Sequence, residues 1–219
     1  MWILYAFGSA FFAGLTAVLA KCGIEHTNSH LATALRTIVV LIFSWIMVGI
    51  VGSFDTIHTI THKTFLFLIL SGISTGASWL CYFKALQLGN INKVTAVDKT
   101  SVVLTIILSL IFFKESVTVY KILGMIILTA GTYLMVEKKE DNKQTSNAWL
   151  LYVVLSVVFA SLTTILGKIG ITNIESNLGT AIRTSIVLVM SWIVVFVTHS
   201  EMNMKSISKK EYFFIVLSG

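Results

Sequence analysis

The chain has 219 residues, of which 56% are hydrophobic and only 12% are charged, whereas a soluble domain usually carries about 25% charged residues. Several apolar runs reach about 20 residues, the length that crosses a bilayer, and this excludes a soluble globular fold. The formal net charge of +6 comes from basic residues scattered between the apolar runs, without a basic stripe or a nucleic-acid-binding motif. We therefore expect a multi-pass helical protein of the cell membrane, with the lipid bilayer as its surroundings and no nucleic-acid partner.

The apolar runs predict seven membrane-length helices and the beginning of an eighth. We expect them at residues 2–22, 31–51, 64–88, 94–113, 117–136, 148–169 and 178–198, with the eighth beginning near Glu211. The most charged connection is EKKEDNKQTSN at residues 137–147, which no membrane interior would accept.

An internal duplication organises the sequence. Residues 2–72 align without a gap on residues 149–219, at a constant offset of 147, and about 31 of the 71 aligned pairs are identical. The stretch LATALRTIVVLIFSW at 31–45 returns as LGTAIRTSIVLVMSW at 178–192. Because the first copy holds five helices, an odd number, the second copy must enter the membrane from the opposite side. The predicted fold is an all-α membrane protein built from an inverted repeat of five transmembrane helices.

The repeat predicts the domain organisation. The first repeat covers residues 1–136, a linker covers 137–147, and the second repeat covers 148–219. The first repeat continues beyond Gly72, the residue aligned with Gly219, and makes two more helices. We therefore expect the second repeat to be incomplete and the sequence to be a shortened version of a ten-helix protein.

Several motifs resemble the EamA-type domain of the drug/metabolite transporter superfamily. They are the arginine Arg36, the stretch WLCYFKALQLGNINKV at residues 79–94, the turn Phe-Lys-Glu at 113–115, and the glycines Gly124 and Gly131. The resemblance extends over both repeats. The chain departs from many relatives in having no proline, which removes one source of helix kinking.

The resemblance implies a secondary transporter or exporter that moves a small metabolite or drug by alternating access. No ATP-binding motif is present, so an ion or substrate gradient must drive transport, and protons are the candidate ion. The alternative is a truncated membrane protein that does not transport and acts as a structural or regulatory partner. Enzyme signatures such as HExxH or GxSxG are absent, and we expect no catalytic residue, metal site or cofactor. Assembly as a homodimer stays open.

The candidate substrate-binding or coupling residues are charged and aromatic side chains within the apolar runs: Arg36, Arg183, Asp98, Lys99, Lys84, Trp79 and Tyr82. Arg36 and Arg183 occupy the same position in the two repeats. An arginine there can bind an anionic group or take part in gating, or it can be a structural residue that anchors the helix near a headgroup or forms an ion pair. Trp79 and Tyr82 are candidates for lining a substrate path, although aromatic residues at helical spacing are more often packing residues.

Asp98 and Lys99 are the most informative charges, because they lie next to each other about one turn inside a predicted membrane helix. Exposure to lipid would be expensive for either residue, so each is expected to face protein or a water-filled cavity. Asp98 is the leading candidate for carrying a coupling proton. The alternative is a structural salt bridge from Asp98 to Lys84 or Arg36.

Overall fold

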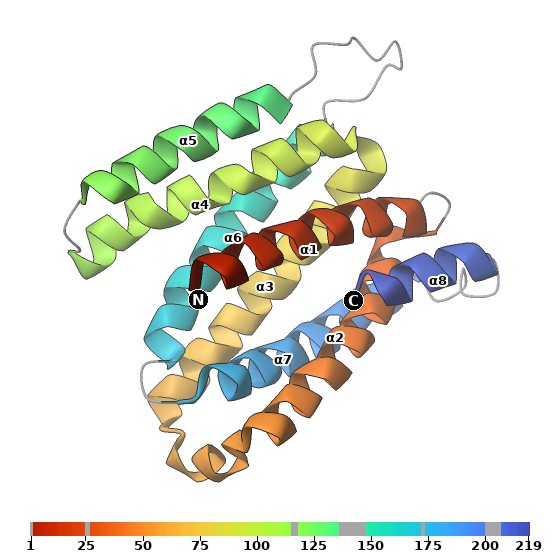
Figure 1. Cartoon of the computed structure of the whole chain (residues 1–219). Helices are drawn as coiled ribbons and strands as arrows, with labels where there is room; N and C mark the ends of the chain where they lie inside the picture. Colours follow the sequence, from red (N-terminus) through yellow and green to blue (C-terminus); the bar gives the residue numbers. More distant parts are fainter. Residues whose placement is uncertain (1, 25–26, 115–117, 136–147, 172–173, 200–206) are drawn as a thin grey trace.

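The structure is a computed structural model that describes residues 2–24, 27–114, 118–135, 148–171, 174–199 and 207–219. These residues form helices joined by short connections and contain no β-strand (Figure 1). The elements are α1 (Trp2–Gly23), α2 (Ser29–Val51), the 3-10 helix η1 (Ser53–Thr59), α3 (His62–Leu88), α4 (Ile91–Phe113), α5 (Val119–Met135), α6 (Ala148–Gly170), α7 (Ser176–Val197) and α8 (Lys209–Leu217). The linker predicted at 137–147 lies outside the described residues.

The prediction of an all-α membrane protein is confirmed. Six helices in the described residues, α1 to α4, α6 and α7, are long and apolar enough to span a membrane. α5 is apolar but has 17 residues, which is about 26 Å at 1.5 Å per residue. η1 was not predicted, because a 3-10 turn in a connection leaves no hydrophobic period in the sequence.

Polar side chains fix where the helices begin. Asn28, Thr61 and Asn90 each accept a hydrogen bond from a backbone N–H in the first turn of α2, α3 or α4. Glu175 does the same at the start of α7 and also accepts a hydrogen bond from Ser53 Oγ at 2.8 Å. The N–H of Asn177, with help from Ser53, lowers the pKa of the Glu175 carboxyl, so this cap is charged at neutral pH.

The helices α2 and α7 pack antiparallel, and the two ends of this pair use equivalent residues. At one end Leu31 and Ala34 of α2 bury against Val195 of α7. At the other end Leu178 and Ala181 of α7 bury against Val48 of α2. Adding 147 to the two residues of the first cluster that come from α2, and subtracting it from Val195, gives the second cluster. The same offset relates the surrounding residues Leu35, Trp192 and Ile207 to Ile182, Trp45 and Ile60.

Close approaches at glycine repeat in the same way. A Cβ atom on Gly170 would lie 3.3 Å from Leu68 of α3, and one on Gly23 would lie 2.8 Å from Ile215 of α8. These two pairs are 147 residues apart, so α6 meets α3 as α1 meets α8. Small residues allow such contacts between helices in a membrane, where van der Waals packing replaces the hydrophobic effect.

A second glycine pair shows the same equivalence. A Cβ atom on Gly72 would lie 3.1 Å from the carbonyl oxygen of Arg183, and one on Gly219 would lie 2.9 Å from that of Arg36. The neighbouring side chains are Ile186 and Val39, which also differ by 147. Each of these contacts between the first and second halves therefore has an equivalent contact in which the two halves have swapped roles.

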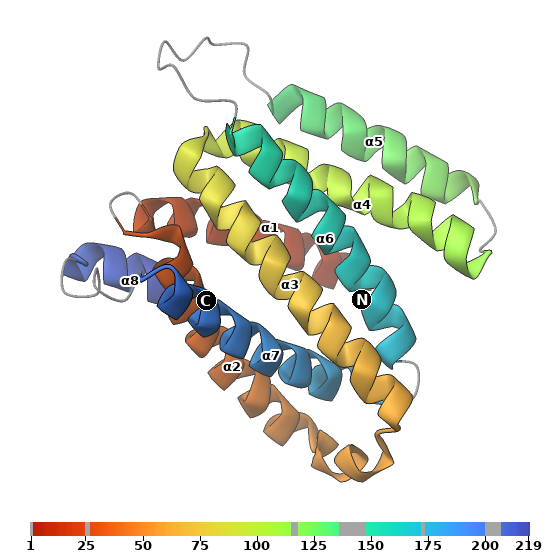
Figure 2. The ribbon, with the colours of Figure 1, turned by 180° about the vertical axis from the view of Figure 1, so that it is seen from behind.

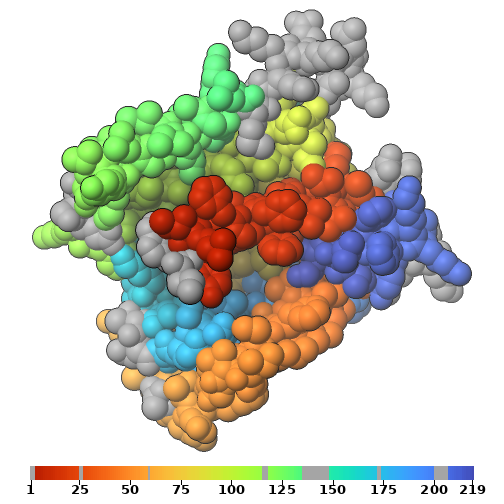
Figure 3. All heavy atoms as spheres, in the orientation of Figure 1, coloured from red at the N-terminus to blue at the C-terminus, as the bar shows by residue number. Residues whose placement is uncertain are grey.

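The remaining helices surround the pair formed by α3 and α6. α3 lies between α6 and α7 (Figure 2), and α4 covers another side of α6. α5 packs on the outer side of α4, and α1 crosses the front of the molecule between α4 and α2 (Figure 3). Exposed side chains on α1 are large and apolar, as the lipid-facing surface of a membrane helix should be: Ile3, Leu4, Tyr5, Phe7, Phe11, Phe12, Leu15 and Val18.

We predict opposite effects for alanine at two glycines. At Gly72 the new Cβ would lie 2.9 Å from Ile186 Cβ and close to a backbone carbonyl, so neither neighbour can move aside easily. Gly72→Ala should lower the free energy of unfolding by about 1–3 kcal/mol. Gly14→Ala is the control, because no atom lies within 4 Å of its Cβ position. It should be neutral or stabilise by up to about 1 kcal/mol. Thermal unfolding in detergent measures both, and equal effects would contradict the close contact.

Candidate functional site

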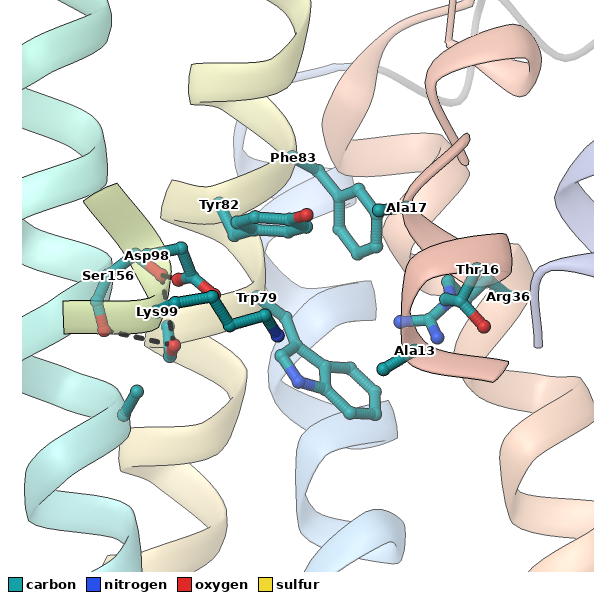
Figure 4. Close-up of a pocket in the computed structure, with 12 residues that line it drawn as sticks. Ala13, Thr16, Ala17, Arg36, Trp79, Tyr82, Phe83, Asp98, Lys99 and Ser156 are labelled. Carbon is teal, nitrogen blue, oxygen red and sulfur yellow. Dashed lines mark hydrogen bonds between the residues drawn. The ribbon is translucent and has the colours of Figure 1, made fainter. Parts of the chain in front are cut away.

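A cavity of about 380 Å³ opens among α1, α2, α3, α4 and α6. Its wall combines small residues of α1 with charged, aromatic and hydroxyl side chains of the other helices (Figure 4). The lining residues are Ala13, Thr16, Ala17, Arg36, Ser78, Trp79, Tyr82, Phe83, Asp98, Lys99, Ser156 and Ala160. A cavity of this size and mixed character is typical of a site for a small molecule.

Arg36 lies two turns after the start of α2 and is held by aromatic rings and by a backbone carbonyl. Its guanidinium carbon lies 4.9 Å from the ring centre of Trp79 and 5.1 Å from that of Phe83, both on α3. Nε and Nη2 donate to the carbonyl oxygen of Ser218 at 3.1 and 2.9 Å. Cation–π contacts and a charge-assisted hydrogen bond together let the membrane interior hold this charge.

Asp98 reaches the cavity from α4 and is bonded to a hydroxyl. Ser156 Oγ of α6 donates to its Oδ1 at 3.0 Å, and the Ser156 hydroxyl lies 3.2 Å from that of Ser78 on α3. The predicted alternative of a salt bridge was wrong: within the described residues, neither Lys84 nor Arg36 forms an ion pair with Asp98. The structure brings α6 against α4 at this point, so a serine takes the place that a cation was expected to fill.

Asp98 and Lys99 lie deeper than the sequence predicted. α4 begins at Ile91, not at 94, because Asn90 caps it through the N–H of Asn92. The two charges are therefore about two turns inside a 23-residue helix. Lys99 extends from α4 into the cavity (Figure 4). In the part of the chain that the structure describes, its ammonium donates no hydrogen bond and forms no ion pair.

Trp79 and Tyr82 line the cavity from α3, together with Phe83, whose ring meets that of Tyr82 edge-on at 5.5 Å. Three aromatic residues in one turn and a half of helix give the cavity a flat apolar wall. Trp79 is also the ring on which Arg36 stacks. The aromatic wall and the cation are thus parts of one surface.

Arg183 and Lys84 do not line this cavity. Arg183 lies at the junction of α3, α6 and α7, where Nη2 donates to Thr75 Oγ1 at 3.3 Å. Gly167 leaves room for it, because a Cβ there would lie 3.2 Å from Nη1. Lys84 donates to Gln87 Oε1 at 3.1 Å, one turn later on α3. The repeat-related arginines therefore occupy different surroundings, and only Arg36 joins Asp98 and Lys99.

A seam of hydroxyl groups joins α3 to α6 between the cavity and Arg183. Ser71 Oγ donates to the carbonyl of Thr163 at 2.9 Å, and Thr75 Oγ1 lies 3.3 Å from Thr163 Oγ1. Ser78 donates to the carbonyl of Ser156 at 3.1 Å. These bonds satisfy buried hydroxyls inside the membrane region and hold the two helices together beyond the cavity.

Ser78, Ser156 and Thr16 were missed by the sequence analysis as cavity residues. Hydroxyl residues are common in membrane helices, and most of them bond to a carbonyl of their own helix, as Ser44 does with Val40. Nothing in the sequence separates Ser156, which faces Asp98, from such residues. The only usable signal was its place two turns before Thr163, on the same face of the helix, which also contacts α3.

Comparison with known proteins identifies relatives over a large part of the chain. Residues 1–137 match the EamA-like transporter family. A protein of Sinorhizobium sp named "Uncharacterized transporter in cobO 3'region" is 42% identical over 134 residues. That match covers 61% of the present chain and 95% of the relative, so the relative is similar to this chain over nearly its whole length.

We predict that the cavity holds water although it lies among membrane helices. Thr16 lines it, whereas Val18, two residues along α1, is exposed on the apolar outer surface. In a background lacking Cys22 and Cys81, Thr16→Cys should react with a charged, membrane-impermeant thiol reagent. Val18→Cys is the matched control and should stay unmodified, because lipid keeps the charged reagent and the thiolate away. Equal labelling of both positions would contradict a water-filled cavity.

Proposed function

Because the chain belongs to the EamA-like transporter family, we propose that it is a secondary transporter whose cavity binds a small molecule and opens alternately to the two sides of the membrane. As a member of this family with six apolar helices of spanning length, it is a multi-pass membrane transporter. The proposal adds the mechanism, alternating access, and the place of binding. The observation that carries it is the cavity in which Asp98 and Lys99 lie two turns inside a membrane helix.

The equivalent contacts of the two halves support alternating access. In inverted-repeat transporters, two halves with nearly the same contacts can exchange conformations and so expose one site to either side. The antiparallel α2–α7 pair and the glycine contacts that repeat at an offset of 147 residues are what such an arrangement needs. The family match ends at residue 137, next to the predicted end of the first repeat at 136, and this supports the division into two repeats.

In this scheme the cavity opens toward one end of the helices and the α3–α6 seam closes the other. The lining residues come from the second half of α3 and the first half of α6. The opposite ends of the same helices meet at Gly170 and Leu68 and at Ser71 and Thr163. Opening to the second side requires these contacts to separate while the cavity mouth closes.

We further propose that Asp98 carries a coupling proton. The Asp98 carboxylate accepts a hydrogen bond from the Ser156 hydroxyl, but within the described residues no cation is bonded to it. Protonation would remove its negative charge. This would raise the net charge of the cavity, which Arg36 and Lys99 also line, from +1 to +2. Because a buried charge is expensive in a membrane, the protonation state of Asp98 would change the relative energies of the open and closed states. The proton would therefore accompany each change of access.

Transport assays test this proposal. A tolerance screen with amines, amino-acid analogues and dyes in cells that express the chain identifies a transported compound. That compound is then followed in proteoliposomes with an imposed pH gradient. Asp98→Asn should abolish uptake driven by the pH gradient but keep exchange of labelled for unlabelled compound, since the cavity shape is unchanged. Asp98→Glu should retain coupling, and Asp55→Asn, at an exposed position in η1, is the control.

Two results would contradict the proposal. Gradient-driven uptake by Asp98→Asn at the wild-type rate would remove Asp98 from the coupling step. Uptake of no compound by the wild-type chain would instead favour a membrane protein that acts without transporting. The exchange measurement separates a defect in coupling from a defect in binding, because exchange needs no net proton movement.

A further inference from the structure

Lys99 is a cation inside a membrane helix, and no described residue forms a hydrogen bond or an ion pair with it. It lies eight residues after the start of α4, which is about 12 Å along the helix, and it lines the cavity. Asp98 is its neighbour on α4, but the two form no ion pair in the described residues. An ammonium at this depth needs a counterion or water, because an unpaired charge is expensive among membrane helices. A ligand anion would meet that need.

Arg36 adds a second positive group to the same wall. Two of its nitrogens, Nε and Nη2, are used by the carbonyl of Ser218. Nη1 donates no hydrogen bond within the described residues, so it keeps donors for a ligand. Arg36 and Lys99 against Asp98 leave the cavity with one excess positive charge.

The net charge of the cavity and its aromatic wall indicate which class of ligand the cavity would bind. A carboxylate carries one negative charge and balances the excess, whereas a phosphate monoester carries about 1.5 to 2 negative charges. Trp79, Tyr82 and Phe83 offer flat apolar surface beside the two cations. The volume of about 380 Å³ lies near the lower limit of small-molecule sites, about 300 Å³, so the ligand must be small.

From this geometry we infer that the substrate is a small organic anion with one carboxylate and a flat apolar body. The carboxylate lies between Lys99 and Arg36, and the apolar body lies against the aromatic residues of α3. Asp98 stays bonded to Ser156 and does not contact the carboxylate. This inference rests on the proposed function only in taking the cavity as the substrate site.

Three probes of nearly equal shape test the charge preference: phenylacetate, its neutral amide phenylacetamide, and the cation phenethylamine. Binding to the purified full chain is measured by the quenching of tryptophan fluorescence and by the shift in melting temperature. Phenylacetate should bind about tenfold or more tightly than the other two, as expected for a charge-assisted contact. Phenylacetate that binds no better than the amide and the amine overturns the inference.

Variants at Lys99 test the assignment within the cavity. Lys99→Gln should bring the affinity for phenylacetate down to that for the amide and leave amide binding unchanged. Lys99→Arg should keep most of the preference, because the charge is retained. Lys63→Gln, at an exposed position at the start of α3, is the matched control and should behave as wild type. Unchanged preference for phenylacetate in Lys99→Gln overturns the role of Lys99.

The outcome is separable from that of the transport proposal. Lys99-dependent binding of phenylacetate without movement across the membrane supports the inference and contradicts transport. Transport of the cationic probe with exclusion of phenylacetate supports a transporter and overturns the inference. Proteoliposomes loaded with each probe in turn distinguish these two cases.

Discussion

Close packing of helix backbones at small residues is the constraint on which this structure depends. Lipid tails are as apolar as leucine side chains, so membrane helices associate through van der Waals contact and hydrogen bonds, not through the hydrophobic effect. Gly72, Gly170 and Gly23 let α3, α6 and α1 approach their neighbours to distances that a Cβ atom would prevent. The antiparallel α2–α7 pair is held by alanine and leucine positions that repeat in both halves. The cavity is the space that this packing leaves among α1, α2, α3, α4 and α6.

The charged side chains of the membrane region are of two kinds: some donate to protein atoms at helix ends and junctions, and others face the cavity. Lys21 donates to the carbonyls of Leu86 and Gly89 at the end of α3. Arg183 donates to Thr75 through Nη2, while its buried Nε has no hydrogen-bond partner among the described residues. Such groups fix helix ends and junctions. Asp98 and Lys99 differ, because they face a cavity and their bonds with the described residues leave them capacity for a ligand or a proton. This difference is what ties the packing of the helices to a transport function.

The sequence predicted the helices well because each is a long apolar run between polar connections, and this signal survives without tertiary information. Its main error at the site was the start of α4, where the cap at Asn90 adds a turn before the apolar run begins. The site residues were only partly predictable. Adjacent charges in an apolar run identified Asp98 and Lys99, and the cavity contains both. The repeat made Arg36 and Arg183 look equivalent, yet only tertiary packing decides which one lies beside Trp79.

The most direct test of the central claim measures whether the α3–α6 seam opens. Spin labels at Lys63 of α3 and Thr164 of α6, both exposed and both near the end of the helices away from the cavity, report the separation of that end. Electron–electron double resonance in lipid discs should resolve two distances, with populations that shift between acidic and alkaline pH and on addition of a transported compound. A single distance that is the same under all these conditions would contradict alternating access at this cavity.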